Sequence, residues 1–132
     1  MLNISVRNKK YNCDITLEHK VTIITGDSGR GKTLLVKSLT DLSGGYKVTY
    51  SEPVKVYELT ERTWKDILLS EHKEKALLII DECDFARTAE FCNTFSRVEN
   101  CYLMCMIRSD DITKLFNDLS VDCTTKDIEE FY

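Results

Sequence analysis

The residues best suited to chemistry form the run 26–33, Gly-Asp-Ser-Gly-Arg-Gly-Lys-Thr, which fits the pattern G-x-x-x-x-G-K-[ST] without a gap. Glycines at these spacings let the backbone curl, so that successive N–H groups point inward and surround phosphate oxygens. Lys32 supplies a point charge for the β- and γ-phosphates of a nucleotide, and the Thr33 hydroxyl is a ligand for Mg²⁺. The pattern therefore predicts a nucleotide site made by Gly26, Asp27, Ser28, Gly29, Arg30, Gly31, Lys32, Thr33 and Leu34.

A second pair of reactive side chains, Asp81 and Glu82, directly follows the apolar run Ala76–Ile80. A carboxylate at the carboxyl end of a parallel strand lies in the crevice where open α/β sheets bind their ligands. The competing interpretation is that the two acids only cap the next helix, because acids are favoured at helix N-termini. That interpretation explains only the acidic pair and does not explain the glycine-rich run.

Three short apolar runs are the elements that would position these residues: Val21–Thr25, Ala76–Ile80 and Cys101–Ile107. Val21–Thr25 is β-branched throughout, and in all three runs hydrophobicity is continuous and does not alternate. This indicates strands covered on both faces, as in a parallel sheet between helices. In the third run, alternate residues should face opposite sides of the sheet, with Leu103 on one side and Met104 on the other.

Helical spacing of apolar residues fills the intervals between these runs. We expect helices after Gly31, after Thr60, over Asp84–Phe95 and after Ser109, with Gly44-Gly45 ending the first of them. Further strands are expected at Lys47–Tyr50 and Val54–Leu59, and Val121–Tyr132 offers one edge strand. Leu2–Val6 and Cys13–Leu17 alternate in polarity and predict an antiparallel hairpin or meander.

Together, the glycine-rich run and the Asp-Glu pair resemble the Walker A and Walker B motifs of P-loop NTPases, and the likeness covers most of the chain. The resemblance implies an α/β three-layer sandwich, with a mostly parallel central sheet flanked by helices and the N-terminal hairpin added to it. It also implies that Asp81 holds Mg²⁺ and that Glu82 orients and polarises the attacking water. An Asp-Glu pair is typical of the branch with a catalytic glutamate, which includes ABC, RecF, SMC and AAA+ proteins. That branch has an extra strand between the two Walker strands, which segments 47–59 can supply.

Arg108 directly follows the Cys101–Ile107 run. If that strand is next to the Walker B strand, Arg108 falls beside the γ-phosphate, where related families have a polar sensor residue. There it would stabilise charge in the transition state. The alternative is an ordinary surface arginine before a helix cap.

Composition bounds the remaining possibilities. The 132 residues carry a net charge of −4, which argues against a dedicated nucleic-acid binder, although an acidic protein can touch DNA or RNA within a complex. No apolar run approaches the roughly 20 residues of a membrane span, and no secretory signal is visible, so we expect a cytoplasmic location. The six cysteines lack Cys-x-x-Cys spacing, which favours buried thiols over a zinc site. We expect a single nucleotide-binding domain over residues 1–132.

Two functions fit these features. The first is a Mg²⁺-dependent ATPase that hydrolyses ATP slowly alone, with Glu82, Lys32 and Arg108 as its catalytic residues, and acts as a homo-oligomer or with a partner protein. The second is a nucleotide-binding switch subunit that does not hydrolyse its ligand. A small-molecule kinase fits less well, because the chain is short for an acceptor pocket and lid. ATP is preferred over GTP because residues 125–127, Thr-Lys-Asp, lack the spacing of a guanine-binding motif.

Overall fold

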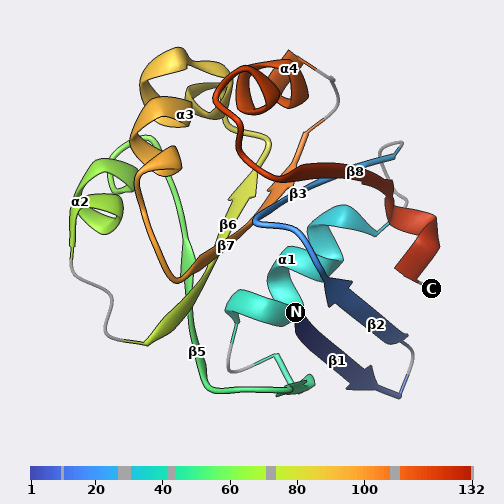
Figure 1. The fold of residues 1–132 in the computed structure, drawn as a ribbon. Helices are drawn as coiled ribbons and strands as arrows, with labels where there is room; N and C mark the ends of the chain where they lie inside the picture. Colours follow the sequence, from blue (N-terminus) through green and yellow to red (C-terminus); the bar gives the residue numbers. More distant parts are fainter. Residues whose placement is uncertain (10, 27–30, 42–43, 71–73, 108–110, 132) are drawn as a thin grey trace.

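The computed structural model describes the whole chain except residues 10, 27–30, 42–43, 71–73, 108–110 and 132. Its centre is a five-stranded sheet in the order β5-β6-β7-β3-β8, and all of its strands are parallel (Figure 1). The strands are β5 (Val54–Glu58), β6 (Lys75–Asp81), β7 (Cys101–Met106), β3 (Val21–Thr25) and β8 (Cys123–Asp127). The expected apolar runs and the expected edge strand therefore all belong to one sheet.

The strand that separates β3 from β6 is β7. The expectation that segments 47–59 supply this strand is wrong. Instead, β5 forms the outer edge of the sheet beside β6, and β4 (Lys47–Tyr50) joins a different sheet. Pro53 precedes β5, and proline is tolerated at the start of an edge strand because its missing N–H removes no bond from the interior.

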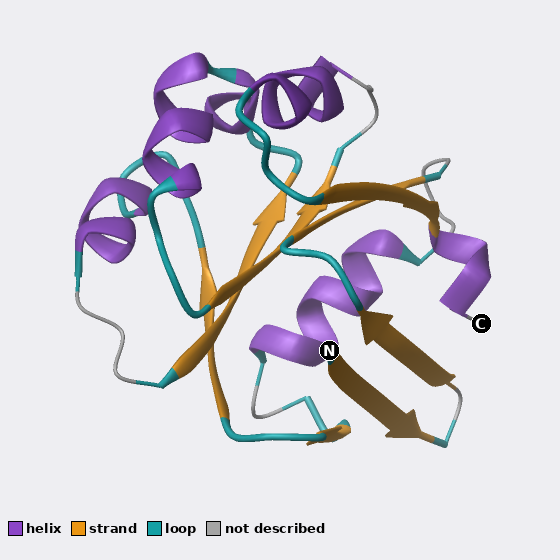
Figure 2. Cartoon of the chain, viewed as in Figure 1, coloured by secondary structure: helices purple, strands orange, loops and turns teal. Residues whose placement is uncertain are grey.

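One face of the parallel sheet is covered by α1 (Lys32–Thr40), and α1 is covered in turn by a three-stranded antiparallel sheet. That smaller sheet has the order β2-β1-β4, with β1 at Leu2–Asn8 and β2 at Tyr11–Leu17. The predicted N-terminal hairpin is confirmed by the β1–β2 pairing. Figure 2 shows α1 lying between the two sheets. Its buried side chains fill that space because Leu35, Val36 and Leu39 recur at helical spacing.

The opposite face carries α2 (Trp64–Leu69), η1 (Asp84–Arg87), α3 (Ala89–Ser96) and α4 (Asp111–Asp118). Aromatic side chains fill this layer in a continuous series of stacked and edge-on contacts: Trp64, Phe85, Phe91, Phe95 and Phe116. Such pairs contribute roughly 0.5–1.5 kcal/mol each beyond the burial of their area.

The predicted alternation along β7 is confirmed. Leu103 and Cys105 belong to the helical layer, whereas Met104 and Met106 belong to the layer of α1. Because both faces are covered, the central strands are almost free of exposed side chains. Burial of each leucine or isoleucine there contributes roughly 1.5–3 kcal/mol to folding.

Two expected helix boundaries are wrong. The stretch Asp84–Phe95 is not one helix, because Thr88 is extended and its hydroxyl accepts a bond from the Phe91 N–H, which starts α3 after the short η1. Gly44-Gly45 does not end α1, whose last residue is Thr40 and whose C-terminal cap is Asp41. Gly45 instead adopts a left-handed φ of 76° in the connection to β4.

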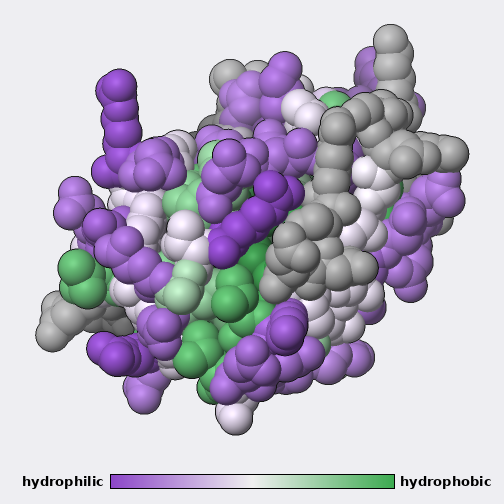
Figure 3. Space-filling view, turned by 90° about the horizontal axis from the view of Figure 1, so that it is seen from above, coloured by the Kyte–Doolittle hydropathy of each residue, from purple (hydrophilic) through white to green (hydrophobic). Residues whose placement is uncertain are grey.

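Polar and charged side chains cover most of the face seen from above, with apolar side chains gathered near its centre (Figure 3). Among the described helices, none has the length and apolar character that a bilayer span requires. The six cysteines are free thiols, and Cys13, Cys92, Cys101 and Cys105 are buried as the sequence predicts.

Candidate functional site

The two chemically suggestive motifs meet at one edge of the parallel sheet. The glycine-rich run begins where β3 ends, and the acidic pair stands where β6 ends, with β7 between them. Of the run, Asp27, Ser28, Gly29 and Arg30 lie outside the described residues. The flanking glycines have left-handed backbone angles, with φ of 143° at Gly26 and 104° at Gly31. Only glycine adopts such angles at low cost, so both positions favour glycine.

The N-terminus of α1 differs in its capping from that of α3. Its N-cap residue is Gly31, no side-chain cap bond is formed there, and the first turn carries no acidic residue. The contrast is α3, where the Thr88 side chain caps the helix and Glu90 complements the helix dipole. The first amides of a helix have no acceptor within the helix itself, which suits them to bind a ligand. A phosphate group is the kind of ligand that such an end attracts.

Lys32 and Glu82, which are 50 positions apart in sequence, form an ion pair across this edge. The Lys32 Nζ donates to Glu82 Oε1 at 3.1 Å, and the lysine residue is only 6% exposed. Glu82 has a left-handed φ of 48°, which is uncommon for a residue other than glycine, asparagine or aspartate. Its N–H donates to the Met106 carbonyl at 2.8 Å, so β7 fixes the strained backbone. From this position the Glu82 carboxylate reaches Lys32 at the start of α1.

Asp81 is half-buried beside this pair. Burial raises the pKa of its carboxyl, the neighbouring Glu82 carboxylate raises it further, and Lys32 lowers it. Cys83, rather than Asp81 or Glu82, is the N-cap residue of the following helix η1. The interpretation that the acids serve as helix caps therefore lacks support.

The oxygen donors near this ion pair suit magnesium. Thr33 is exposed at the start of α1, next to Lys32, and Asp81 precedes Glu82. A hydroxyl and a carboxylate are hard oxygen ligands, and Mg²⁺ in nucleotide sites is held by one or two such groups together with phosphates and water. Among the described residues, no group of three or more His, Cys, Asp or Glu side chains is arranged to hold a metal ion. Thr33 and Asp81 are therefore candidate magnesium ligands only together with phosphates and water.

The other predicted site residues have different positions. Leu34 is partly buried, and its side chain packs against the hydrophobic cluster around α1. The strand that precedes Arg108 was expected to be next to the strand that ends in Asp81, and the pairing of β7 with β6 confirms this. On its other side, the Ile107 N–H after β7 donates to the Ile24 carbonyl of β3. Arg108 itself lies outside the described residues.

One neighbour of the run was missed by sequence reasoning. Ile128, in η2 (Ile128–Phe131), lies against Gly26, so closely that a Cβ built on the glycine would be 2.6 Å from its Cγ2 atom. Nothing in the spacing of the sequence pairs these two positions. Only the parallel pairing of β8 with β3 brings them together.

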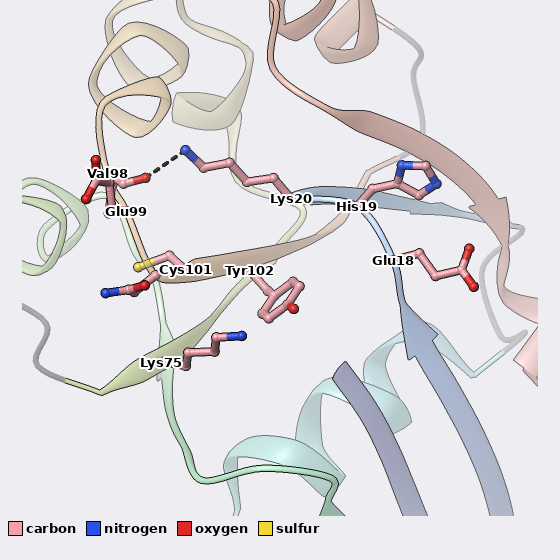
Figure 4. Close-up of a pocket in the computed structure, with 9 residues that line it drawn as sticks. Glu18, His19, Lys20, Lys75, Val98, Glu99, Cys101 and Tyr102 are labelled. Carbon is pink, nitrogen blue, oxygen red and sulfur yellow. Dashed lines mark hydrogen bonds between the residues drawn. The ribbon is translucent and has the colours of Figure 1, made fainter. Parts of the chain in front are cut away.

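The opposite edge of the sheet has a pocket of about 370 Å³ (Figure 4). Its lining includes His19, Lys20, Lys75, Cys101 and Tyr102, which stand before or at the beginnings of strands. Figure 4 shows the Lys20 ammonium turned to the Val98 carbonyl, to which it donates at 2.7 Å. The Lys20 ammonium therefore binds a main-chain carbonyl just after α3.

Comparisons with protein-family models, with curated proteins and with solved structures find no match.

Proposed function

We propose that this protein binds ATP with Mg²⁺ and hydrolyses its β–γ phosphoanhydride bond. The observation that supports this most is the contact of Lys32 with Glu82, because it joins the two motifs whose combination the chemistry needs. An isolated glycine-rich turn would not require a carboxylate beside its lysine. The strand order supports the proposal as well, since it sets both motifs at the same edge.

In this proposal Lys32, the first amides of α1 and the amides of the glycine-rich run bind the phosphates. Thr33 and Asp81 would hold Mg²⁺, which neutralises charge on the β- and γ-oxygens. Glu82 would accept a proton from the attacking water and orient it, and general-base catalysis of this kind contributes about 10²–10⁴-fold. The phosphates would have to replace Glu82 as the partner of Lys32, and this replacement would release the carboxylate to act on water.

We expect hydrolysis by the isolated chain to be slow. P-loop enzymes that lack an arginine at the γ-phosphate are slower by about 10³–10⁵-fold. Arg108 or an arginine from a second copy or partner protein would supply this charge. Light scattering with and without nucleotide would show whether nucleotide drives association.

The second candidate is a switch subunit that binds nucleotide without hydrolysing it. The observation that favours it is the same ion pair, because a glutamate that remains on Lys32 would not be available to water. Hydrolysis therefore has to be measured separately from binding.

The test compares wild type with Glu82→Gln, with Glu58→Gln as a matched control. Glu58 ends β5 at the same edge of the sheet and is exposed. We expect Glu82→Gln to bind ATP at least as tightly as wild type, because the amide holds Lys32 less strongly, and to hydrolyse it about a hundredfold more slowly. Glu58→Gln should match wild type in both measurements.

Calorimetric titration with ATP, ADP and GTP in Mg²⁺, together with a phosphate-release assay, gives both quantities. Absence of nucleotide binding by wild type would overturn the proposal. Binding without hydrolysis in all three proteins would establish the switch.

A further inference from the structure

The first glycine of the run is in contact with a segment that follows it by about a hundred residues. Besides Ile128 Cγ2 at 2.6 Å, a Cβ on Gly26 would have Ile128 Cβ at 3.6 Å and Asp127 Oδ1 at 3.8 Å as its nearest atoms. The Ile128 side chain therefore occupies the space that any other residue at position 26 would need. Ile128 is itself 0% exposed.

Ile128 cannot easily move away from Gly26, because its own segment is fixed on both sides. Before it, β8 pairs with β3 over its whole length, with Asp127 opposite Thr25. After it, η2 is held by two capping bonds: the Asp127 N–H donates to Glu130 Oε2 at 2.7 Å, and the Glu129 N–H donates to Asp127 Oδ1 at 2.9 Å. The reciprocal pair resembles a capping box and sets the direction of the helical turn.

The buried side chains of this segment also connect to both elements that flank the run. Ile128 and Phe131 belong to the same hydrophobic cluster as Ile24, which precedes Gly26, and Leu35, which lies in the first turn of α1. The segment 126–131 therefore packs in the same layer as the end of β3 and the start of α1, which flank the glycine-rich run.

We propose that residues 126–131 position the start of the glycine-rich run at Gly26, and that Ile128 is the positioning residue. This inference rests on the proposed function. Gly26 has a φ of 143°, and without a side chain a glycine can adopt many backbone conformations around such a value. The Ile128 side chain on one side of Gly26 excludes some of these conformations. Because Gly26 is restricted before binding, less of its backbone freedom is lost when phosphate binds, and affinity rises.

The experiment compares Ile128→Ala and Ile128→Val with Ile112→Ala. Ile112 is equally buried, at 0% exposed, but lies in α4 on the other face of the sheet. We expect Ile128→Ala to weaken ATP binding about tenfold, which is the scale of fixing one backbone residue. Ile128→Val, which keeps the branched side chain, should restore binding to within about threefold of wild type. Ile112→Ala should lose stability and keep its affinity for ATP.

The steady-state constants separate positioning from general damage. We expect Ile128→Ala to raise KM for ATP while kcat changes by less than about twofold, because the loop still reaches its active geometry once nucleotide is bound. Urea unfolding of each variant gives the stability against which the affinities are compared. Equal losses of affinity in Ile128→Ala and Ile112→Ala, at equal losses of stability, would overturn the inference.

Hydrogen exchange without nucleotide tests positioning independently of ATP binding. In Ile128→Ala, amides of the peptide 24–35 should exchange about tenfold faster than in wild type, whereas in Ile112→Ala they should follow global stability alone. If wild type fails to bind ATP but this difference appears, the proposed function is wrong and the positioning stands. If ATP binds and the exchange rates are unchanged, the positioning is wrong.

Discussion

Two lysines, one at each edge of the parallel sheet, show how differently this fold uses a positive charge. Lys20, at the amino edge, donates to the Val98 carbonyl at 2.7 Å and approaches the Phe95 and Ser96 carbonyls at 3.5 Å. Its ammonium also lies 5.0 Å from the centre of the Phe95 ring. Lys32, at the carboxyl edge, has the Glu82 carboxylate as its ion-pair partner.

The difference lies in the partners. Main-chain carbonyls at the end of α3 cannot leave Lys20 without unfolding the helix end, so this lysine is a structural cap. The partner of Lys32 is instead the end of a side chain, which changes its position through side-chain torsions without breaking main-chain hydrogen bonds of a helix. A charge held by a movable side chain is available for exchange with a ligand, whereas one held by the main chain is not.

Replacement of Lys32 gives the largest expected effect. Lys32→Met should weaken ATP binding by about a hundredfold, since a hydrogen bond to a charged group contributes up to roughly 3 kcal/mol. Titration calorimetry measures the affinity. A variant that binds ATP as wild type does would break the contrast between the two lysines.

Lys20→Met should have the opposite profile. We expect the free energy of unfolding to fall by roughly 1–3 kcal/mol, because the carbonyls at the end of α3 lose a charged donor. Affinity for ATP should remain within about twofold of wild type, because the substitution is at the far edge of the sheet. Urea unfolding and nucleotide titration on the same preparation check both parts, and a loss of affinity comparable to that of Lys32→Met would refute the assignment.

A smaller expected effect is on how the free energy of unfolding depends on pH through Asp81. Because burial and Glu82 raise the pKa of Asp81 above its ordinary value of 3.8, the folded state keeps this proton to higher pH than the unfolded state does. The contribution of Asp81 to stability therefore falls as pH rises through the folded-state pKa, and it stays lower at neutral pH. Without nucleotide, Asp81→Asn should be more stable than wild type at pH 7, and this advantage should disappear below pH 3.8.

Urea unfolding of both proteins across this pH range provides the measurement. A stability difference that does not depend on pH would show that the carboxyl titrates normally. In the presence of ATP and Mg²⁺ the order should reverse, because wild type keeps the proposed metal ligand, binds the nucleotide more tightly and is therefore stabilised more.

The smallest expected effect is on the alkylation rates of two cysteines, one at each edge of the sheet. Cys83 is partly exposed next to the acidic pair, and its Sγ donates to the Asp81 carbonyl at 3.4 Å. Cys101, at the other edge, is 6% exposed, and burial raises its pKa to about 11. ATP with Mg²⁺ should slow alkylation of Cys83 about threefold and leave the rate at Cys101 unchanged. Mass spectrometry of labelled peptides gives both rates, and equal protection of the two would indicate a global effect.

Much of the architecture could be predicted because its elements carry local signals. The apolar runs of β3, β6 and β7 identify buried parallel strands, and their alternation identifies the face of each residue. The error over the strand between β3 and β6 has a tertiary cause, because strand order is not a local property. The two errors over helix boundaries arose where two local signals compete. Thr88 interrupts the helical spacing of Phe85 and Phe95 with a side-chain cap, and Gly44-Gly45 imitates a helix end three residues late.

The sequence by itself determined the chemistry of the candidate site, because Lys32, Thr33, Asp81 and Glu82 stand in two contiguous motifs. It also determined that each motif follows a buried strand. Only the tertiary structure decided that β7 separates these strands, that Lys32 reaches Glu82 at 3.1 Å, and that Ile128 closes on Gly26. The physical reason is that strand order and side-chain packing depend on contacts between distant positions, and no local spacing encodes them.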